Sequence, residues 1–253
     1  MGTTGESPTL VRAEEMRLFA EVKSAVGERG SVIAGTGSNS TAEALETTKE
    51  AERIGVDACL LVVPYYNKPT QEGLYQHFKT IAQGTNLPCI IYNVPSRTII
   101  NLSADTLIKL SHIDNIIGVK EASGNLDQIS KIISGAKEGF LVWSGNDSDT
   151  FPILALGGYG IISVASHLVG NQIKEMIDSF LRGKIEEAAS IHHRLLPLLN
   201  ALFIVSNPIP VKYAVNYVGF NVGKPRLPLT EPDEKSAAII KDALKNYKID
   251  LPV

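Results

Sequence analysis

The stretch "NIIGVKEASGN", residues 115–125, combines the pattern of a buried strand with a lysine at its centre. Four apolar or small residues, 116–119, lead directly into Lys120. An ammonium group removed from water is costly unless it is paired or deprotonated. Neighbouring strand residues point to opposite faces, so Glu121 is poorly placed to neutralise Lys120. From this pattern alone, a catalytic lysine and a lysine paired with some carboxylate are equally open interpretations.

The same kind of apolar run recurs along residues 1–183, each time followed by a polar loop and a segment with helical periodicity. Runs that are apolar on both faces and are separated by helices are typical of parallel strands covered on both sides. Ser103 and Thr70 stand where the N-caps of two of these helices are expected. The pattern predicts an α/β fold with six strands, at residues 31–37, 58–66, 88–95, 116–123, 140–147 and 160–166.

Polar side chains favour a closed barrel over an open sheet. A (β/α)8 TIM barrel builds its site at the C-terminal ends of many strands, whereas a doubly wound sheet uses only the strands beside its switch point. "GTGSNS", residues 35–40, lacks the third glycine of a dinucleotide-binding loop, and no phosphate-loop motif is present. Polar pairs fall at the C-terminal ends of four successive predicted strands: Tyr65 and Tyr66, Tyr92 and Asn93, Lys120 and Glu121, and Asn146 and Asp147.

The predicted strands stop at residue 183. Three amphipathic helices separated by Pro and Gly are expected beyond it, at residues 184–203, 210–219 and 234–247. The sequence has no long flexible linker, so we predict barrel units over residues 1–183 and a C-terminal helical appendix over residues 184–253, within one domain.

Composition excludes several classes of partner. The 253 residues are 44% hydrophobic and 20% charged, with a formal net charge of −3, which is ordinary globular composition. There is no basic tract, no signal-like segment, and no apolar run near the roughly 18 residues that span a bilayer. We therefore expect a cytoplasmic protein with no nucleic-acid or membrane partner.

Metal or disulfide chemistry is not expected either. Cys59 and Cys89 lie in apolar runs, which is typical of small buried hydrophobic residues. Three histidines are isolated, and the adjacent His192 and His193 would point to different sides of a helix.

Several motifs together carry a resemblance over nearly the whole chain. "GTTGES" (2–7), "PYYNKP" (64–69), "YNVPSRT" (92–98), "GVKEASGN" (118–125) and "GGYGIISV" (157–164) resemble those of the dihydrodipicolinate synthase family of pyruvate-dependent class I aldolases and lyases. The resemblance implies a (β/α)8 barrel with extra C-terminal helices and no cofactor. It also implies that Lys120 forms a Schiff base with pyruvate, and that Tyr92 shuttles protons during imine formation.

Further roles follow from the resemblance alone. Thr3 and Tyr66 are similar to the residues that complete a hydroxyl relay with Tyr92, with Tyr66 reaching across a subunit interface. Thr4 is similar to a ligand of the pyruvate carboxylate, and the backbone of Ile162 to a wall of the same pocket. Arg97 is similar to the family's clamp for the carboxylate of the second substrate, L-aspartate 4-semialdehyde.

A regulatory site is also implied. In many relatives lysine binds at a dimer interface, but Arg12 and Glu15 stand where lysine-sensitive relatives often carry histidines. Inhibition by lysine is thus left open. The positions that match the lysine-binding site are Ser7, Asn39, Glu43 and Tyr65.

The implied activity is that of a 4-hydroxy-tetrahydrodipicolinate synthase working as a homo-oligomer, with dimer and tetramer (a dimer of dimers) both open. One alternative is a related lyase such as N-acetylneuraminate lyase or a 2-keto-3-deoxy sugar acid aldolase, which takes a sugar-like aldehyde. Another is a non-catalytic paralogue that binds a keto acid without turnover.

The barrel is expected to be incomplete as written. "GTTGES" resembles the loop after the family's second strand, so we expect the first strand, the first helix and most of the second strand to be missing. A start inside a longer reading frame, with roughly 40 residues omitted, would explain this. A short form completed by its oligomer partners is the alternative.

Overall fold

A computed structural model of the chain describes residues 2–251. Within these residues the chain forms one six-stranded parallel sheet in sequential order. The strands are β1 (Ile33–Gly35), β2 (Ala58–Val62), β3 (Cys89–Asn93), β4 (Ile116–Glu121), β5 (Leu141–Ser144) and β6 (Gly160–Ile161).

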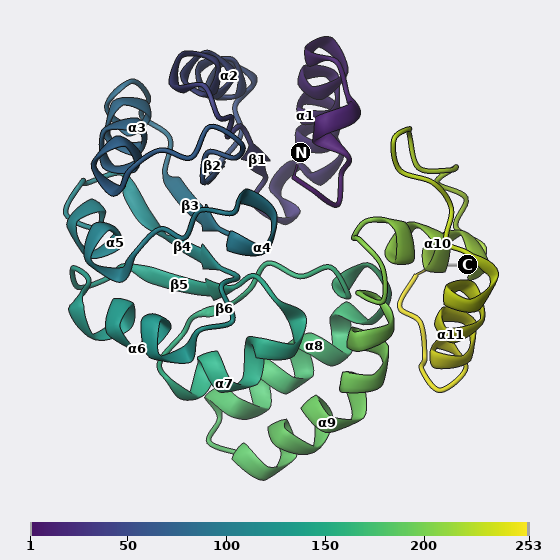
Figure 1. The fold of residues 1–253 in the computed structure, drawn as a ribbon. Helices are drawn as coiled ribbons and strands as arrows, with labels where there is room; N and C mark the ends of the chain where they lie inside the picture. The colour runs from purple at the N-terminus through teal and green to yellow at the C-terminus, as the bar shows by residue number, and fades with distance from the viewer. Residues whose placement is uncertain (1, 252–253) are drawn as a thin grey trace.

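Helices alternate with these strands and then continue alone. The strands lie on the inside of the molecule, and α2, α3, α5, α6 and α7 form an outer arc around them (Figure 1). The α-helices are α1 (Arg12–Val26), α2 (Thr41–Ile54), α3 (Gln71–Gln83), α4 (Pro95–Thr98), α5 (Ala104–Leu110), α6 (Leu126–Gly135), α7 (Thr150–Ala155), α8 (Ser166–Leu181), α9 (Ile185–Ala201), α10 (Ile209–Tyr217) and α11 (Glu234–Leu244). Short 3₁₀ turns η1 (Ser7–Thr9), η2 (Gly27–Arg29) and η3 (Asp147–Asp149) occur between them.

All six predicted strands are confirmed, but each is shorter than predicted. Asn93 and Glu121 are the last residues of β3 and β4, whereas the polar residues after β2 and β5 lie in loops or turns beyond the strand ends. Pro64 follows β2 closely and Pro95 follows β3, and proline has no N–H to donate to a ladder. The predicted N-caps are also confirmed, since Thr70 Oγ1 accepts from the Gly73 N–H and Ser103 Oγ from the Thr106 N–H.

The sheet is curled but open within residues 2–251. There, β1 pairs only with β2 and β6 only with β5. The structure thus has an α/β fold with a curled parallel sheet and does not contain a closed eight-stranded barrel (Figure 1).

The three helices predicted after residue 183 are confirmed as α9, α10 and α11. They share one apolar core with α8, in which Leu168, Leu195, Ala214 and Ile240 are all buried. Packing against α8 fixes α10 relative to the sheet, so the segment that leads into α10 can reach the ends of the strands.

Both cysteines are buried, as predicted. Cys59 on β2 pairs in register with Cys89 on β3, and their Sγ atoms lie 3.4 Å apart as free thiols. A hydrogen bond with Cys59 and burial both raise the pKa of the Cys89 thiol. The pair therefore packs as small apolar side chains in the core.

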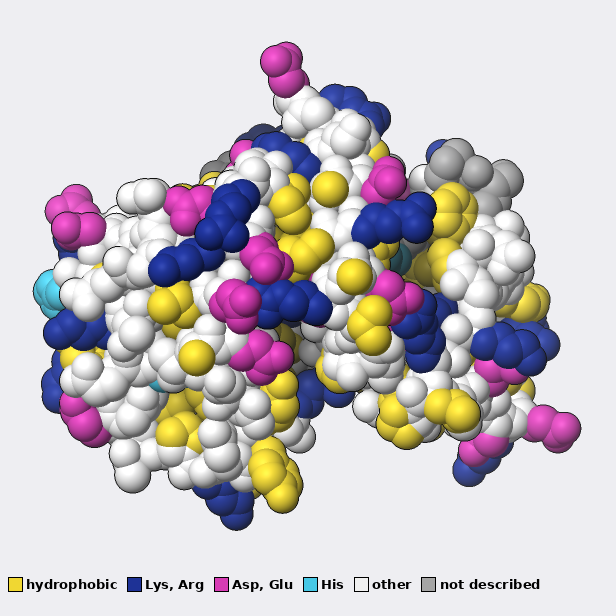
Figure 2. All heavy atoms as spheres, turned by 90° about the horizontal axis from the view of Figure 1, so that it is seen from above, with side chains coloured by type: hydrophobic (Ala, Val, Ile, Leu, Met, Phe, Trp, Pro, Cys, Tyr) yellow, Lys and Arg dark blue, Asp and Glu magenta, His cyan; other side chains and the backbone are white. Residues whose placement is uncertain are grey.

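The visible surface carries charges of both signs. Lys and Arg side chains alternate with Asp and Glu side chains over the face in Figure 2, and neither sign gathers into a large patch there. Among residues 2–251, no helix has the length and apolar character needed to cross a bilayer.

Candidate active site

Lys120 is the fifth residue of β4 and faces the interior of the curled sheet. Its register partners are Tyr92 on β3 and Trp143 on β5. The Lys120 Nζ atom lies 4.2 Å from the centroid of the Tyr92 ring. The amine is thus held against an aromatic face at the C-terminal end of the strand.

Glu121 points to the opposite face, as strand alternation predicts. It is fully buried, and both of its carboxylate oxygens accept from Asn93 Nδ2 at 3.1 Å. The Ser123 N–H donates to Oε1 at 2.8 Å. Glu121 is therefore satisfied by a structural network behind the sheet, which confirms the prediction that it is poorly placed to neutralise Lys120.

Burial is the main influence on the pKa of the Lys120 amine. It lowers the pKa of Lys120 to about 8, and Arg97 acts in the same direction, whereas Asp147 opposes them. Among the described residues, Lys120 forms no ion pair. About a tenth of the amine is therefore neutral and nucleophilic at pH 7, and about half of it near pH 8.

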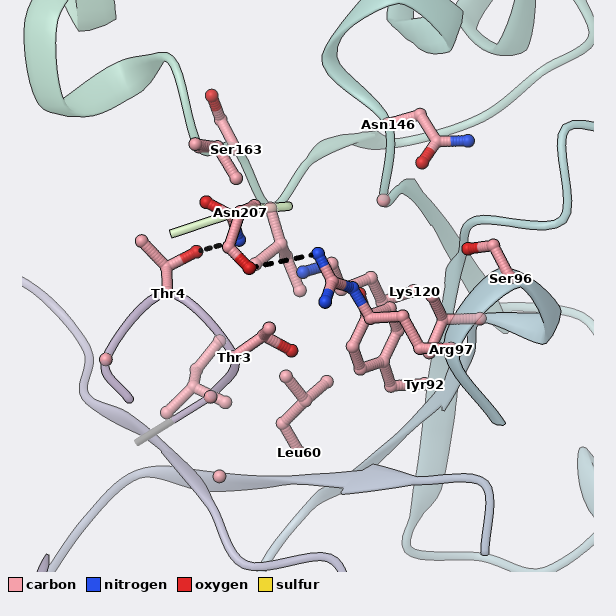
Figure 3. Close-up of a pocket in the computed structure, with 18 of the residues that line it drawn as sticks. Thr3, Thr4, Leu60, Tyr92, Ser96, Arg97, Lys120, Asn146, Ser163 and Asn207 are labelled. Atoms are coloured by element: carbon pink, nitrogen blue, oxygen red, sulfur yellow. Dashed lines mark hydrogen bonds between the residues drawn. The ribbon is translucent and has the colours of Figure 1, made fainter. Parts of the chain in front are cut away.

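A cavity of about 380 Å³ opens in front of this lysine. Figure 3 shows Lys120, Tyr92 and Arg97 on one side of it and the loop with Thr3 and Thr4 on the other. The structure thus brings together six residues predicted from the sequence: Lys120, Tyr92, Thr3, Thr4, Arg97 and Ile162.

Tyr66 is the predicted site residue that the cavity does not include. Its side chain is 90% exposed and lies outside the lining. Its φ of 74° is uncommon for a residue other than glycine. Within this chain the structure does not place Tyr66 beside Tyr92.

Tyr92 is held as a protonated phenol. Burial raises the pKa of Tyr92, while Arg97 and the side chain of Thr3 partly lower it. A buried phenol of this kind can donate a proton and accept one in turn.

Asn207 connects both sides of the cavity. Its Nδ2 donates to Thr4 Oγ1 at 3.0 Å, and its carbonyl oxygen accepts from Arg97 Nη2 at 3.2 Å (Figure 3). The Oδ1 atom of Asn207 is buried and has no partner among the described residues. The sequence analysis missed this residue, because it lies outside every predicted strand and outside every motif that carries the family resemblance.

Asp147 supports the wall of the cavity. It is 3% exposed, it accepts from the N–H groups of Val164 and Ala165 at 3.0 and 3.3 Å, and the Ser163 hydroxyl donates to it. Burial raises the pKa of Asp147, and Lys120 partly offsets that effect. The sequence placed Asp147 at a strand end but gave it no role.

Gly145 provides space beside the lysine. A Cβ atom at this position would lie 2.7 Å from Ala122 Cβ and 3.2 Å from Lys120 Cγ. Any larger residue would displace the Lys120 side chain or β4 itself.

The profile of the Dihydrodipicolinate synthetase family matches residues 1–247. This chain belongs to that family. A 4-hydroxy-tetrahydrodipicolinate synthase from Dehalococcoides mccartyi strain CBDB1 is 68% identical over all 253 residues, which cover 85% of that relative.

Solved structures of the family agree with the fold. A Cyanidioschyzon merolae member with lysine bound has a TM-score of 0.95 at 48% identity, with 97% of this chain and 84% of that chain covered. An Acinetobacter baumannii dihydrodipicolinate synthase complexed with pyruvate has a TM-score of 0.94 at 42% identity, with 97% and 84% covered.

A second cavity of about 530 Å³ adjoins the first in this family member. Ser7, Glu43 and Tyr65, three of the residues predicted for lysine regulation, line it. Asn39 is outside the lining, but its Nδ2 donates to the Tyr65 carbonyl oxygen at 3.1 Å. The walls of the two cavities have several residues in common, and Thr3, Tyr92 and Arg97 are among them.

Proposed function

We propose that this chain is a 4-hydroxy-tetrahydrodipicolinate synthase, which condenses pyruvate with L-aspartate 4-semialdehyde through a Schiff base on Lys120. The observation that carries the proposal is the buried Lys120 amine, with its lowered pKa, beside the Tyr92 phenol in a cavity. The name and 68% identity of the D. mccartyi relative support the reaction type.

The proposed mechanism begins with attack of the neutral Lys120 amine on the ketone carbon of pyruvate. Tyr92 relays one proton from the attacking nitrogen to the ketone oxygen and then gives its own proton to the resulting hydroxyl, so that water leaves and a protonated imine forms. The imine nitrogen draws electrons, the Tyr92 phenolate takes a methyl proton, and the enamine carbon attacks the aldehyde of the second substrate. Cyclisation by the amino group of that substrate then releases Lys120.

Two carboxylates must be held for this reaction. The Thr4 hydroxyl and the backbone at Ile162 line the cavity beside Lys120 and suit the pyruvate carboxylate. Arg97 lines the same cavity with its guanidinium directed into it (Figure 3), which suits the carboxylate of aspartate semialdehyde. The A. baumannii relative complexed with pyruvate supports pyruvate as the first substrate.

An oligomer is part of the proposal. An exposed Tyr66 in an unusual backbone conformation suits a side chain that enters the site of a neighbouring subunit and joins the relay of Tyr92 and Thr3. A dimer of dimers in the cytoplasm is the assembly we propose. We also propose that the curled sheet is part of a (β/α)8 barrel, since the cavity lies at the C-terminal ends of its strands.

We propose lysine binding in the second cavity, which the C. merolae relative with bound lysine supports. Inhibition is not part of this proposal because Arg12 and Glu15, in place of histidines, line the cavity.

The rate of imine formation is expected to rise with pH and to level off above a midpoint near 8. Only the neutral amine attacks, and the pKa of Lys120 lies at about 8. Below that value the neutral fraction falls about tenfold per pH unit. Initial rates of borohydride trapping with pyruvate, read by mass spectrometry, measure the profile. A midpoint near the ordinary lysine value would contradict a buried nucleophile.

A coupled assay tests the whole function. Purified protein is supplied with pyruvate and either L-aspartate 4-semialdehyde or N-acetylmannosamine, and consumption of each aldehyde is followed. We expect turnover with aspartate semialdehyde and a kcat/KM lower by at least about a hundredfold with the sugar, because only the former offers a carboxylate to Arg97. Preference for the sugar would indicate that the chain is a sugar-acid lyase. Trapping of pyruvate without turnover of either aldehyde would indicate a non-catalytic binding protein.

A further inference from the structure

The loop that carries Thr3 and Thr4 is tied to the C-terminal helices through Glu6. The Glu6 carboxylate forms an ion pair with Lys212 on α10 through Oε2. Its other oxygen, Oε1, accepts from the Arg226 backbone N–H at 2.8 Å. Residues separated by more than 200 positions in the sequence thus meet at one carboxylate.

This ion pair is largely shielded from water. The side chains of Glu6 and Lys212 are 11% and 15% exposed. Burial acts to raise the pKa of Glu6, but the hydrogen bonds from Lys212 and Arg226 outweigh it, so the net pKa is lowered. The carboxylate is therefore charged at neutral pH, and each group loses its main partner if the other is removed.

Glu6 also holds the backbone of the loop. Its N–H donates to the Thr3 carbonyl oxygen at 3.0 Å, and its own carbonyl oxygen accepts from the Thr9 N–H at 2.9 Å. The position of Glu6 consequently fixes the turn from which the Thr3 and Thr4 side chains enter the cavity.

The segment that leads into α10 contacts the Thr3–Thr4 loop at a second point. Asn207 lies two residues before α10 and donates to Thr4 Oγ1, while Lys212 lies within α10 and binds Glu6. The Arg226 side chain donates to both carboxylate oxygens of Glu14 on α1, at 2.7 and 2.8 Å. Arg226, whose backbone N–H donates to Glu6, is therefore itself anchored to the N-terminal part of the chain.

We propose that Glu6 and Lys212 are positioning residues for the active site, which hold the Thr3–Thr4 turn against Lys120 and Tyr92. The proposal rests on the proposed function of the cavity. Neither Glu6 nor Lys212 is among the described residues that line the two cavities, so neither contacts the substrate space. Their effect is exerted through the placement of the two threonines, where a shift of about 1 Å can cost about a hundredfold in rate.

Three single variants and one double variant test this in the full chain. Glu6→Gln and Lys212→Met each break the ion pair, Lys212→Arg keeps it, and Glu6→Gln with Lys212→Met removes both charges. Lys224→Met is the matched control, because it breaks the exposed pair of Lys224 with Glu231 in the same C-terminal region.

Pair-breaking variants are expected to lower the rate of pyruvate trapping at Lys120 by about a hundredfold. The pH midpoint of trapping should stay near 8, since the surroundings of the lysine are unchanged. Amide hydrogen exchange at residues 3–7 should become faster, and Lys212→Arg should restore most of the rate. Lys224→Met should match the wild type in every measurement.

Wild-type trapping rates in Glu6→Gln and Lys212→Met would overturn the inference, as would unchanged exchange at residues 3–7. If a single variant does not fold because of its unpaired buried charge, the double variant decides by the same two measurements. Failure of the proposed function has a different signature, because the wild-type chain itself would then not be trapped by pyruvate and borohydride.

Discussion

Replacing Lys120 with Met abolishes covalent trapping by pyruvate and borohydride, and it raises the free energy of unfolding at pH 7 by up to about 3 kcal/mol. The first effect follows because no other described lysine combines a place inside a strand with access to the cavity. The second follows because burial lowers the pKa of Lys120 from 10.5 to about 8. This pKa shift measures the free-energy cost of keeping the charged amine in the folded protein.

The sign of the stability effect sets its pH dependence. The folded-state pKa lies below the unfolded value, so the unfolded chain binds more protons between about pH 8 and about pH 10.5. The wild type therefore carries the full penalty below about pH 8 and loses it as the pH rises toward 10.5. The difference between wild type and Lys120→Met should shrink over the same interval in chemical denaturation.

Lys68→Met is the matched control, because Lys68 is exposed in the loop after β2 and should leave trapping intact. Peptide mapping of the reduced adduct locates the reacting amine. An adduct on Lys68 or Lys212, or full trapping in Lys120→Met, would refute the assignment of the nucleophile.

Arg97→Ala is expected to lower kcat/KM for aspartate semialdehyde. The loss corresponds to about 2–5 kcal/mol of transition-state stabilisation. Pyruvate trapping should change far less, because the first condensation does not use this guanidinium. Its loss should also shift the pH midpoint of trapping upward, since Arg97 contributes to the lowered pKa of Lys120.

Arg97→Lys separates charge from geometry in this test. It keeps a cation but loses the planar fork, so it should recover the pH midpoint better than it recovers use of the aldehyde. An equal fall in trapping and turnover would instead mean that Arg97 acts through its bond to the Asn207 carbonyl and is structural.

Local rules were sufficient to predict that Lys120 and Glu121 lie on opposite faces of the sheet. Alternation alone separated the two side chains, and the buried Asn93 network around Glu121 confirms that separation. Parallel order then brought Tyr92 beside Lys120, because each lies one residue before the end of its strand and the two strands are neighbours. Strand ends were predicted less well, since an apolar run does not reveal where ladder hydrogen bonding stops.

Contacts between distant segments had no such local signal. The amide of Asn207 and the ion pair of Glu6 with Lys212 depend on how α10 packs against α8 and the N-terminal loop. Single-sequence patterns report periodicity over a few turns, so they cannot pair residues 200 positions apart. Asp147 was visible as a polar strand end, but its partners in residues 163–165 were not.

The two buried thiols have a practical consequence. Cys59 and Cys89 are the only cysteines in the sequence, both are fully buried, and the raised pKa of Cys89 disfavours its reactive thiolate. A maleimide dye should therefore leave the native fold unlabelled while attaching quantitatively to one cysteine introduced at an exposed position outside the site, such as Lys224. Fluorescence from that single reporter would follow subunit association in solution without first removing either natural cysteine.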